Sequence, residues 1–174
     1  MSRSPPAFIA YLGSVVLLSL LVGCGVPAHT QETQQPEIVA EAALPQPASV
    51  GDEIALRAIL LVGKPYRYGG ADLEGFDCSG MVYFIHQALG IDVPRTAAQQ
   101  QHAAARVAKA ELQPGDLLFF RTTRSKRISH VAIYVGENRF VHAPQTGKLI
   151  ELRTLDDQYY GRRLVGSGRF YPGS

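Results

Sequence analysis

The sequence predicts an α+β fold, in which N-terminal helices pack on a central antiparallel sheet of about five to six strands. Three observations lead to this fold class. Apolar residues follow helical spacing in the first half of residues 51–174, and short apolar runs separated by turn residues fill the second half. Residues 1–50 follow neither pattern, so the folded domain is expected to cover residues 51–174.

Three helices are expected at the start of the domain. The first begins after Ser49, whose hydroxyl can cap it, and ends before the Gly-Lys-Pro sequence at 63–65. The second follows Asp77, a candidate N-cap, and stops near Gly90 after a broad apolar face. The third follows the capping-box pattern at 96–99.

The second half of the domain is predicted to form strands, because it holds short apolar runs bounded by turn residues. The expected strands cover residues 117–120, 131–135, 139–142, 149–152 and 164–171. Turn-like residues at 136–138 predict that the second and third of these strands form an antiparallel hairpin.

The charge balance argues against a nucleic-acid partner. The chain has 174 residues and a formal net charge of +2. Because Arg3 is the only charged residue before Cys24, the rest of the chain carries 16 of the 17 basic residues and all 15 acidic ones. A nucleic-acid-binding domain usually carries a strong basic excess, which is missing here.

The N-terminal segment has the features of a secretory signal. Arg3 precedes an apolar run at 5–22, and small residues flank Cys24. The sequence Leu-Val-Gly-Cys at 21–24 resembles the lipobox of bacterial lipoproteins, which implies a signal peptide at 1–23, cleavage before Cys24, and lipid on its thiol and amine. A transmembrane anchor is the alternative, but the run is short for a full span and no basic cluster follows it.

Residues 24–50 are expected to form a lipidated N-terminus and a flexible linker. They are rich in Pro, Gln, Ala, Thr and Glu and lack periodic apolar spacing. Gly25 follows the lipobox where a retention-type Asp could stand. By resemblance to enteric sorting signals, this implies a periplasmic protein anchored in the outer membrane of a Gram-negative bacterium.

Cys78 is the candidate nucleophile. It follows Asp77 at the predicted start of a helix, where backbone N–H groups and the helix dipole favour the thiolate over the thiol. A disulfide with Cys24, the only other cysteine, is the alternative. Lipid on Cys24 would instead leave Cys78 as a free thiol in an oxidising compartment, which marks it as reactive.

A cysteine nucleophile needs a base, and His130 and His142 are the candidates. They lie at the start of one predicted strand and at the end of the next, so a hairpin turning at 136–138 would return both rings to the same end of the sheet. A one-residue register slip would put them on opposite faces, and a structural role for each is the alternative. His86 and His102 are expected to be partly exposed surface residues.

Zinc held by Cys78, His130 and His142 is a second alternative, because a cysteine and two histidines can bind it. The sequence contains no closely spaced pair of ligands among them. We therefore expect neither a metal nor another cofactor.

Six short motifs support a family resemblance. They are Tyr-Arg-Tyr-Gly-Gly at 66–70, Phe-Asp-Cys-Ser-Gly at 76–80, Val-Pro-Arg-Thr at 93–96, Gln-Pro-Gly-Asp-Leu at 113–117, Ser-His-Val-Ala-Ile-Tyr at 129–134 and Phe-Val-His-Ala at 140–143. In this order they resemble the NlpC family of bacterial cell-wall cysteine peptidases, over residues 51–171. The resemblance implies a reduced papain-like fold.

The resemblance also implies roles for single residues. Cys78 is expected to be the nucleophile, and His130 the base that takes its proton and later protonates the leaving amine. His142 corresponds to a third polar residue that orients the His130 ring and fixes its tautomer. Tyr66 is expected to direct its hydroxyl towards the oxyanion, next to a backbone N–H donor.

Asp77, Ser79 and Arg95 lie in the matched motifs and are candidates for substrate binding. For Asp77, a helix cap is the favoured interpretation over catalysis. Ser79 needs no special explanation as a small residue in the first turn of a helix. Tyr68 stands where many family members have Trp, which keeps an aromatic wall at that position.

The function implied by the resemblance is that of a peptidoglycan endopeptidase acting through a thioester on Cys78. Two bonds compete, the D-glutamyl–diaminopimelate bond and the diaminopimelate–D-alanine cross-link. The expected partners are peptidoglycan stem peptides and a membrane reached through lipid on Cys24, with any regulatory protein unidentified. A catalytically idle wall-binding or scaffold lipoprotein is the alternative from another class, and an amidase or acyltransferase with a non-wall substrate is a further one.

Overall fold

The computed structural model describes residues 47–173 of the chain. The predicted signal peptide, Cys24 and the linker before Pro47 lie outside the described residues. Within residues 47–173, no helix is long and apolar enough to cross a membrane. The sequence predicts that the folded domain begins at residue 51, four residues after the first described residue.

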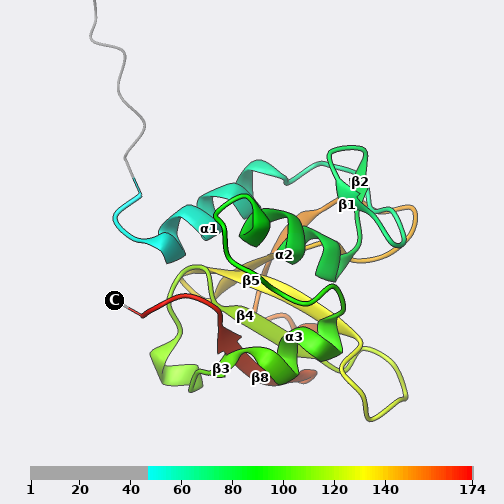
Figure 1. The fold of residues 1–174 in the computed structure, drawn as a ribbon. Coiled ribbons are helices and arrows are strands. Elements are labelled where there is room, and N and C mark those ends of the chain that lie inside the picture. The colour runs from blue at the N-terminus through cyan, green and yellow to red at the C-terminus, as the bar shows by residue number, and fades with distance from the viewer. Residues whose placement is uncertain (1–46, 174) are drawn as a thin grey trace, which may run out of the picture. The chain divides into compact units, whose positions relative to one another are not determined.

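The described residues form an α+β domain, which confirms the predicted fold class (Figure 1). Its helices are α1 (Val50–Leu60), α2 (Cys78–Gln87), α3 (Ala97–Ala103), α4 (Gln158–Gly161) and the 3₁₀ helix η1 (Lys109–Glu111). Its main strands are β3 (Ala105–Arg106), β4 (Leu117–Phe120), β5 (His130–Gly136), β6 (Arg139–His142), β7 (Glu151–Thr154) and β8 (Leu164–Arg169). They form one antiparallel six-stranded sheet with the order β3-β8-β4-β5-β6-β7.

Most predicted elements are present, and the differences concern short ones. The strand expected at 149–152 begins two residues later, as β7. The sequence did not predict β3, η1, α4 or the two-stranded pair of β1 (Ala71–Asp72) and β2 (Gly75–Phe76). Elements of two to four residues are too short to show a periodic apolar pattern, so only tertiary contacts define them.

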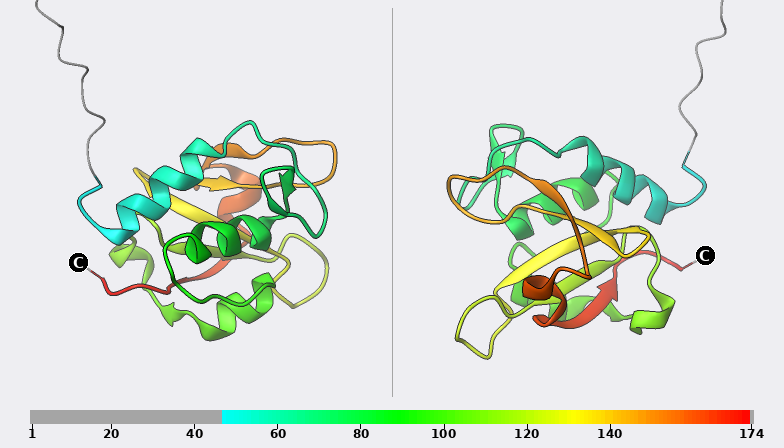
Figure 2. Two further views of the ribbon diagram at one scale, coloured as in Figure 1. Left: turned by 45° about the horizontal axis from the view of Figure 1, so that its top comes forward. Right: turned by 180° about the vertical axis from the view of Figure 1, so that it is seen from behind.

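Helices α1 and α2 lie on one face of the sheet and pack against β5 (Figures 1 and 2). The core on this face includes Ile54 and Ala58 of α1, Met81 and Ile85 of α2, and Val131 and Ile133 of β5. A second, smaller core covers the other face and includes Leu118, Phe120, Ala132, Phe140 and Leu155. Because both faces are covered, all four residues of β4 are buried, which explains its unbroken apolar run.

Three predicted caps are confirmed. The side chain of Ser49 accepts a hydrogen bond from the backbone N–H of Asp52, and Asp77 accepts one from Gly80. Thr96 caps α3 by accepting from the backbone N–H of Gln99. Each cap satisfies an N–H group that the helix itself leaves unpaired.

The prediction for His86 was wrong, because its side chain is fully buried rather than partly exposed. Its Nδ1 lies 2.8 Å from the carbonyl oxygen of Val82, and its ring packs edge-on against Phe170. Burial lowers the pKa of His86 to about 4. His86 lies one helical turn after Val82, on the face of α2 that the C-terminal segment covers, and the local pattern of α2 does not reveal that cover.

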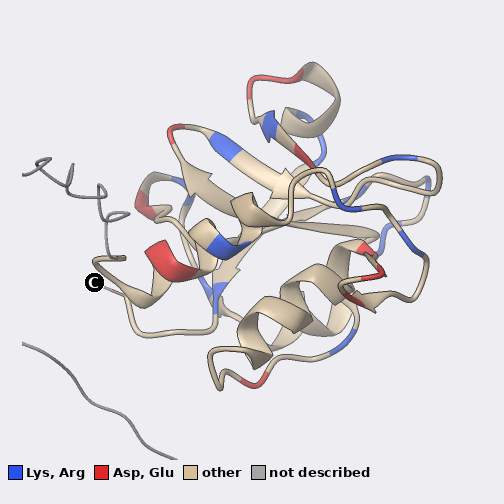
Figure 3. Ribbon diagram, turned by 90° about the horizontal axis from the view of Figure 1, so that it is seen from above, with Lys and Arg blue, Asp and Glu red and all other residues tan. Residues whose placement is uncertain are grey.

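Charged residues of both signs are spread over the described residues (Figure 3). Helix α1 carries both, with Asp52 and Glu53 in its first turn and Arg57 in its last. The order matches the helix dipole, which favours acidic residues at the start of a helix and basic ones at its end.

Candidate active site

Cys78 is the first residue of α2, directly after the cap Asp77. The two carboxylate oxygens of Asp77 hold two segments together. Oδ1 accepts from the N–H of Gly80 at 2.6 Å, and Oδ2 accepts from the N–H of Gly69 at 3.0 Å. The cap therefore also fixes the loop at 66–70 against the helix that presents the thiol.

Glycine is required where this loop crosses α2. A Cβ added to Gly80 would clash with the carbonyl oxygen of Gly70. Gly69 has a φ of +71°, in the left-handed region that glycine adopts without strain. The loop with Tyr66 can thus approach the start of α2 closely, which places the tyrosine near the thiol.

The surroundings of the Cys78 thiol shift its pKa in two directions. Burial raises the pKa of Cys78 and is the dominant effect. The backbone N–H groups of Val131 and Ser79 favour the thiolate and act in the opposite direction, as the helix N-terminus was expected to do. Burial prevails, so the resting side chain is a neutral thiol that must lose its proton when it reacts.

His130 and His142 form the hydrogen-bonded pair at the start of β5. Nε2 of His130 lies 2.9 Å from Nδ1 of His142, and the two rings are nearly perpendicular, with centroids 5.0 Å apart. The β5–β6 hairpin pairs Ile133 with Val141, a register that puts both histidines on the same face of the sheet. The predicted adjacency is confirmed.

Both rings are buried and neutral. The side chains of His130 and His142 are 5% and 0% exposed. Burial lowers the pKa of each ring to about 3. The neighbouring His142 ring lowers the pKa of His130 further, and the positive charge of Arg153 lowers that of His142. Two neutral rings that face each other through one nitrogen each share a single hydrogen, so the tautomer of one fixes that of the other.

Glu151 is a site residue that the sequence did not indicate. It pairs with His142 across β6 and β7, and its Oε1 lies 3.3 Å from Nε2 of His142. That nitrogen is buried and makes no hydrogen bond within the described residues. Arg153 donates to the same Oε1 at 2.9 Å, which holds the carboxylate in place.

Tyr160 of α4 is a second residue that the sequence did not indicate. Its ring centroid lies 4.7 Å from that of His142 and 6.1 Å from that of His130. Burial raises the pKa of Tyr160 to about 12, so its hydroxyl stays protonated near neutral pH. A tyrosine in a polar C-terminal turn has no local signal for this position, because only the docking of α4 brings it to the histidines.

Tyr66 lies near the thiol, as expected. It lines the same pocket as Cys78, and its pKa is raised by burial and, to a lesser degree, by charge at Cys78 and Asp77. The phenol therefore stays protonated and can donate a hydrogen bond. Its backbone N–H donates to the carbonyl oxygen of Lys148 at 2.9 Å, which joins this loop to the segment between β6 and β7.

Asp77, Ser79 and Arg95 form one polar network. The Arg95 guanidinium donates to both carboxylate oxygens of Asp77 at 2.9 and 2.8 Å, to Ser79 Oγ at 3.1 Å and to the carbonyl oxygen of Gly70 at 3.2 Å. Burial acts to raise the pKa of Asp77, but the hydrogen bonds from Arg95 and Gly80 outweigh it and hold the pKa below its usual value. The three candidates for substrate binding thus support the helix start and also line the pocket beside Cys78.

Cys78 and His130 line two different pockets. The first has a volume of about 540 Å³ and is lined by Tyr66, Tyr68, Gly69, Asp77, Cys78, Ser79, Arg95, Thr96, Ala97, Ala98, Ile128 and Ser129. The second has a volume of about 360 Å³ and is lined by Thr122, Thr123, His130, Pro144, Gln145, Lys148, Glu151, Arg153, Tyr159 and Tyr160. The start of α2, the β4–β5 loop and the β6–β7 loop, which contribute to these pockets, gather at one end of the sheet (Figures 1 and 2).

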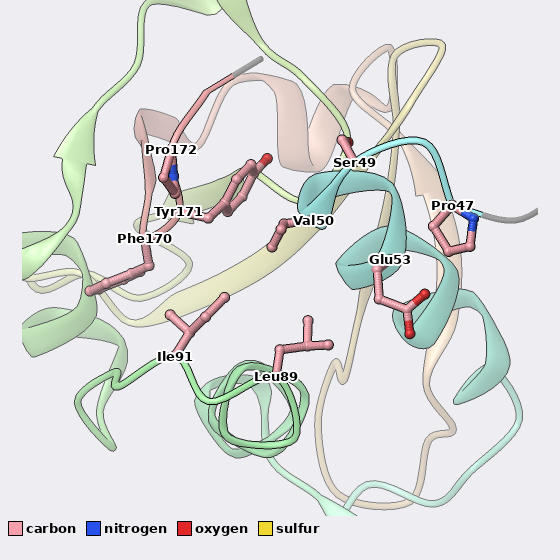
Figure 4. Close-up of a pocket in the computed structure, with 9 residues that line it drawn as sticks. All are labelled: Pro47, Ser49, Val50, Glu53, Leu89, Ile91, Phe170, Tyr171 and Pro172. Carbon is pink, nitrogen blue, oxygen red and sulfur yellow. The ribbon is translucent and has the colours of Figure 1, made fainter.

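A third pocket, of about 390 Å³, lies elsewhere, between the start of α1, the end of α2 and the C-terminal segment (Figure 4). Its lining is mostly apolar, with Val50, Leu89, Ile91 and Phe170 among the residues that face it. Neither a cysteine nor a histidine lines it. Cys78 and His130 therefore line other pockets than this one.

The profile of the NlpC/P60 family matches residues 63–169. The chain belongs to the NlpC/P60 family. The match covers β4, β5, β6 and all residues of the candidate site, so the family assignment and the geometry concern the same part of the molecule.

Curated members of the NlpC/P60 family are similar in sequence. The murein DD-endopeptidase MepH of Escherichia coli is 44% identical over 112 residues, which are 62% of this chain and 41% of MepH. The γ-D-glutamyl-L-lysine dipeptidyl-peptidase of Bacillus subtilis is 38% identical over 127 residues, which are 72% of this chain and 43% of that enzyme. The chain thus matches less than half the length of both relatives.

Solved structures of the family share the fold. An NlpC/P60 family protein from Bacillus cereus has a TM-score of 0.67 at 32% identity, over 71% of this chain and 41% of its own. A lipoprotein-like NLP/P60 protein from Staphylococcus aureus has a TM-score of 0.63 at 36% identity, over 71% of this chain and 42% of its own. The predicted family fold is confirmed.

Proposed function

We propose that this NlpC/P60 protein is a cysteine endopeptidase that hydrolyses a peptide bond of peptidoglycan. The observation that carries the proposal is the buried His130–His142 pair at the start of β5, where the next residue, Val131, donates its N–H to the Cys78 thiol. These two contacts support a site that combines a nucleophile, a base and a residue that orients the base. One curated relative is named a murein DD-endopeptidase, and the other is named a peptidase of a γ-D-glutamyl-L-lysine bond.

The shared hydrogen of the pair decides which nitrogen acts as the base. Nε2 of His130 faces His142, so Nδ1 is the nitrogen left to accept the thiol proton. Nδ1 can accept only if Nε2 of His130 carries the hydrogen and donates it to Nδ1 of His142. His142 must then carry its own hydrogen on Nε2, next to the carboxylate of Glu151.

The reaction proceeds in two halves. Cys78 transfers its proton to Nδ1 of His130, and the sulfur attacks the scissile carbonyl carbon. The C–N bond breaks as His130 returns that proton to the leaving amine, which gives a thioester on Cys78. Water then gives a proton to His130 and attacks the thioester, and release of the carboxylic acid restores the thiol.

Tyr66 and the backbone are proposed to stabilise the negative oxygen of each tetrahedral intermediate. The phenol is protonated and lies in the pocket with Cys78, and the first N–H groups of α2 are free of partners within the helix. Loss of one such donor typically raises the barrier by about 3–4 kcal/mol. Tyr66→Phe should therefore reduce kcat by about two to three orders of magnitude.

Digestion of purified sacculi tests the proposed activity. The full chain in detergent is incubated with sacculi, and soluble muropeptides are identified by mass, with Cys78→Ala as the matched inactive variant. Release by the unsubstituted chain and none by the variant is the expected result. If neither releases peptides from any sacculus type but both bind sacculi, the idle wall-binding lipoprotein is the better description.

The bond proposed first is the diaminopimelate–D-alanine cross-link. The more similar of the two relatives is named a DD-endopeptidase, and the other is named for a glutamyl bond. Mass analysis of products from a purified cross-linked dimer distinguishes the two bonds. Two monomeric muropeptides indicate cross-link cleavage, whereas release of a fragment that begins with diaminopimelate indicates the glutamyl bond.

Membrane attachment is proposed from the sequence before Pro47. The lipobox-like residues 21–24 would place lipid on Cys24 and hold the enzyme on the inner leaflet of the outer membrane, close to the wall. Palmitate labelling in cells with separation of the two membranes tests this. Label in the outer-membrane fraction that Cys24→Ala abolishes supports the proposal, and an unlabelled chain contradicts it.

A further inference from the structure

The linings of the pocket beside His130 and the pocket beside Cys78 are in contact. Two direct contacts join their linings. The backbone N–H of Tyr66, in the thiol pocket, donates to the carbonyl oxygen of Lys148, in the histidine pocket. The N–H of Thr122, in the histidine pocket, donates to Ser129 Oγ at 2.8 Å, and Ser129 lines the thiol pocket.

In the proposed reaction the two pockets would bind different halves of the substrate. The acyl half of the substrate becomes attached to Cys78, so it must lie in the pocket that Cys78 lines. The leaving amine takes its proton from His130, so the leaving half must pass over His130, which lines the other pocket. A peptide that crosses the thiol would thus place its leaving half between the β4–β5 and β6–β7 loops.

Both candidate bonds release an amine of diaminopimelate, the L-centre amine from the D-glutamyl bond and the D-centre amine from the cross-link. Cleavage of the D-glutamyl–diaminopimelate bond and cleavage of the diaminopimelate–D-alanine cross-link differ in the acyl half. In both, the departing amine belongs to a diaminopimelate residue. At its D centre this residue carries a carboxylate that lysine, its counterpart in other peptidoglycans, lacks.

Lys148 is the cation of this pocket that is available for a ligand. Its side chain is exposed and makes no ion pair or hydrogen bond among residues 47–173. The other basic residue of the lining, Arg153, is already held by Glu151 at 2.9 Å and lies 3.9 Å from Asp157. The pocket thus offers one unpaired positive charge next to the base.

We propose that the pocket between His130 and Lys148 binds the diaminopimelate residue of the leaving half, with Lys148 paired to its free carboxylate. This inference rests on the proposed function for the direction of the peptide. It is drawn for the cross-link, where the leaving amine and the free carboxylate share the D centre. Cleavage of the D-glutamyl bond would release the amine of the L centre and put that carboxylate at the far end of the residue. The proposed pairing predicts discrimination between diaminopimelate and lysine at the leaving position.

Three matched peptides test the proposal. They contain the diaminopimelate–D-alanine cross-link bond and differ only in the residue that supplies the leaving amine, which is diaminopimelate, diaminopimelate amidated at its free carboxyl, or lysine. The full chain in detergent is assayed for kcat/KM on each, together with Lys148→Gln. Lys109→Gln is the control variant, because Lys109 lies in η1 and lines neither pocket.

The unsubstituted chain and Lys109→Gln should prefer the carboxylate over the amide by about threefold to tenfold, the range for a partly exposed charge pair. Lys148→Gln should lose that preference and keep its rate on the amide within about twofold. A preference that survives in Lys148→Gln, or its absence from the unsubstituted chain, overturns the inference.

A binding measurement separates this inference from the activity itself. The Cys78→Ala chain is titrated with a diaminopimelate-ended product peptide and with its amide. Tighter binding of the acid that Lys148→Gln removes supports the pocket even if no peptide is hydrolysed. Equal binding of both forms contradicts the inference whatever the activity.

Discussion

The nucleophile region and the histidine region of this site are built in different ways. Cys78 is held by local contacts near the start of α2, where Asp77 caps the helix and Arg95 binds the cap. His130 and His142 are held by pairing of separate strands and are buried between two layers. The first region is polar and partly exposed, whereas the rings of the second are buried and neutral.

The difference has a consequence for pH. Asp77 has a pKa below its usual value, so its contribution to stability is lost only when the pH falls below about 4, the ordinary pKa of the group. The buried histidines have pKa values of about 3, below the ordinary 6.5, so their contribution is present above pH 6.5 and declines as the pH falls from there. The histidine region should weaken first on acidification.

Replacement of the base should have the largest effect and test the histidine region directly. His130→Ala should lower kcat/KM on a stem peptide by about 10²–10⁴-fold, the range for loss of a general base. The control is His102→Ala, because His102 is exposed and lies outside the two site pockets. Circular dichroism shows whether the variant is folded, and a folded His130→Ala with near-full activity would remove this residue from the mechanism.

The pH dependence of the unfolding free energy should reveal the contribution of a buried histidine. For His86, whose pKa is about 4, stability should fall by on the order of 3 kcal/mol between pH 6.5 and pH 4. The reason is that the unfolded chain takes up a proton there and the folded chain does not. Urea unfolding at several pH values measures this, and His86→Leu should flatten the curve by about 1.4 kcal/mol per pH unit. An unchanged slope in His86→Leu would show that His86 is charged in the folded state.

Removal of the cap should weaken the nucleophile region alone. Asp77→Ala should lower the free energy of unfolding by about 1–2 kcal/mol, because the helix loses its cap and Arg95 loses its partner. Asp77→Asn is the matched variant, since its side-chain oxygen can still accept from Gly80. A loss in Asp77→Asn as large as that in Asp77→Ala would assign the stability to the Arg95 ion pair rather than to the cap.

Substitution of Glu151 should have the smallest effect and refine the account of the histidine region. Glu151→Leu removes the acceptor nearest to Nε2 of His142 and should lower kcat by at most about fivefold, the size of a partly exposed charge contact. Glu151→Gln retains an acceptor oxygen and should keep most of the rate. Nitrogen NMR of the imidazoles should show more of the opposite tautomer in Glu151→Leu, and identical spectra in both variants would exclude a role in fixing the tautomer.

Much of the site could be predicted because its signals are local. The Asp77 cap, the Cys78 helix and the hairpin between His130 and His142 each depend on neighbouring residues, and a helix or hairpin obeys rules of spacing and turn chemistry. The six sequence motifs also indicated the protein family. The order of helices before strands was sufficient for the fold class.

Other features depended on contacts between distant segments. Glu151 reaches His142 through the pairing of β6 with β7, and Tyr160 reaches both rings through the docking of α4. The burial of His86 depends on the C-terminal segment, and the raised pKa of the Cys78 thiol depends on how much protein surrounds it. A sequence pattern cannot measure such burial, because it depends on what another part of the chain covers.

The sequence by itself determined the elements that carry Cys78, His130 and His142, since capping, periodicity and turns act over a few residues. Tertiary structure alone decided which nitrogen of each ring is engaged, which carboxylate lies next to His142, and that Lys148 borders the pocket lined by His130. Hydrogen bonds and burial energies fall off within a few ångströms, so such relations exist only once the strands and loops have packed.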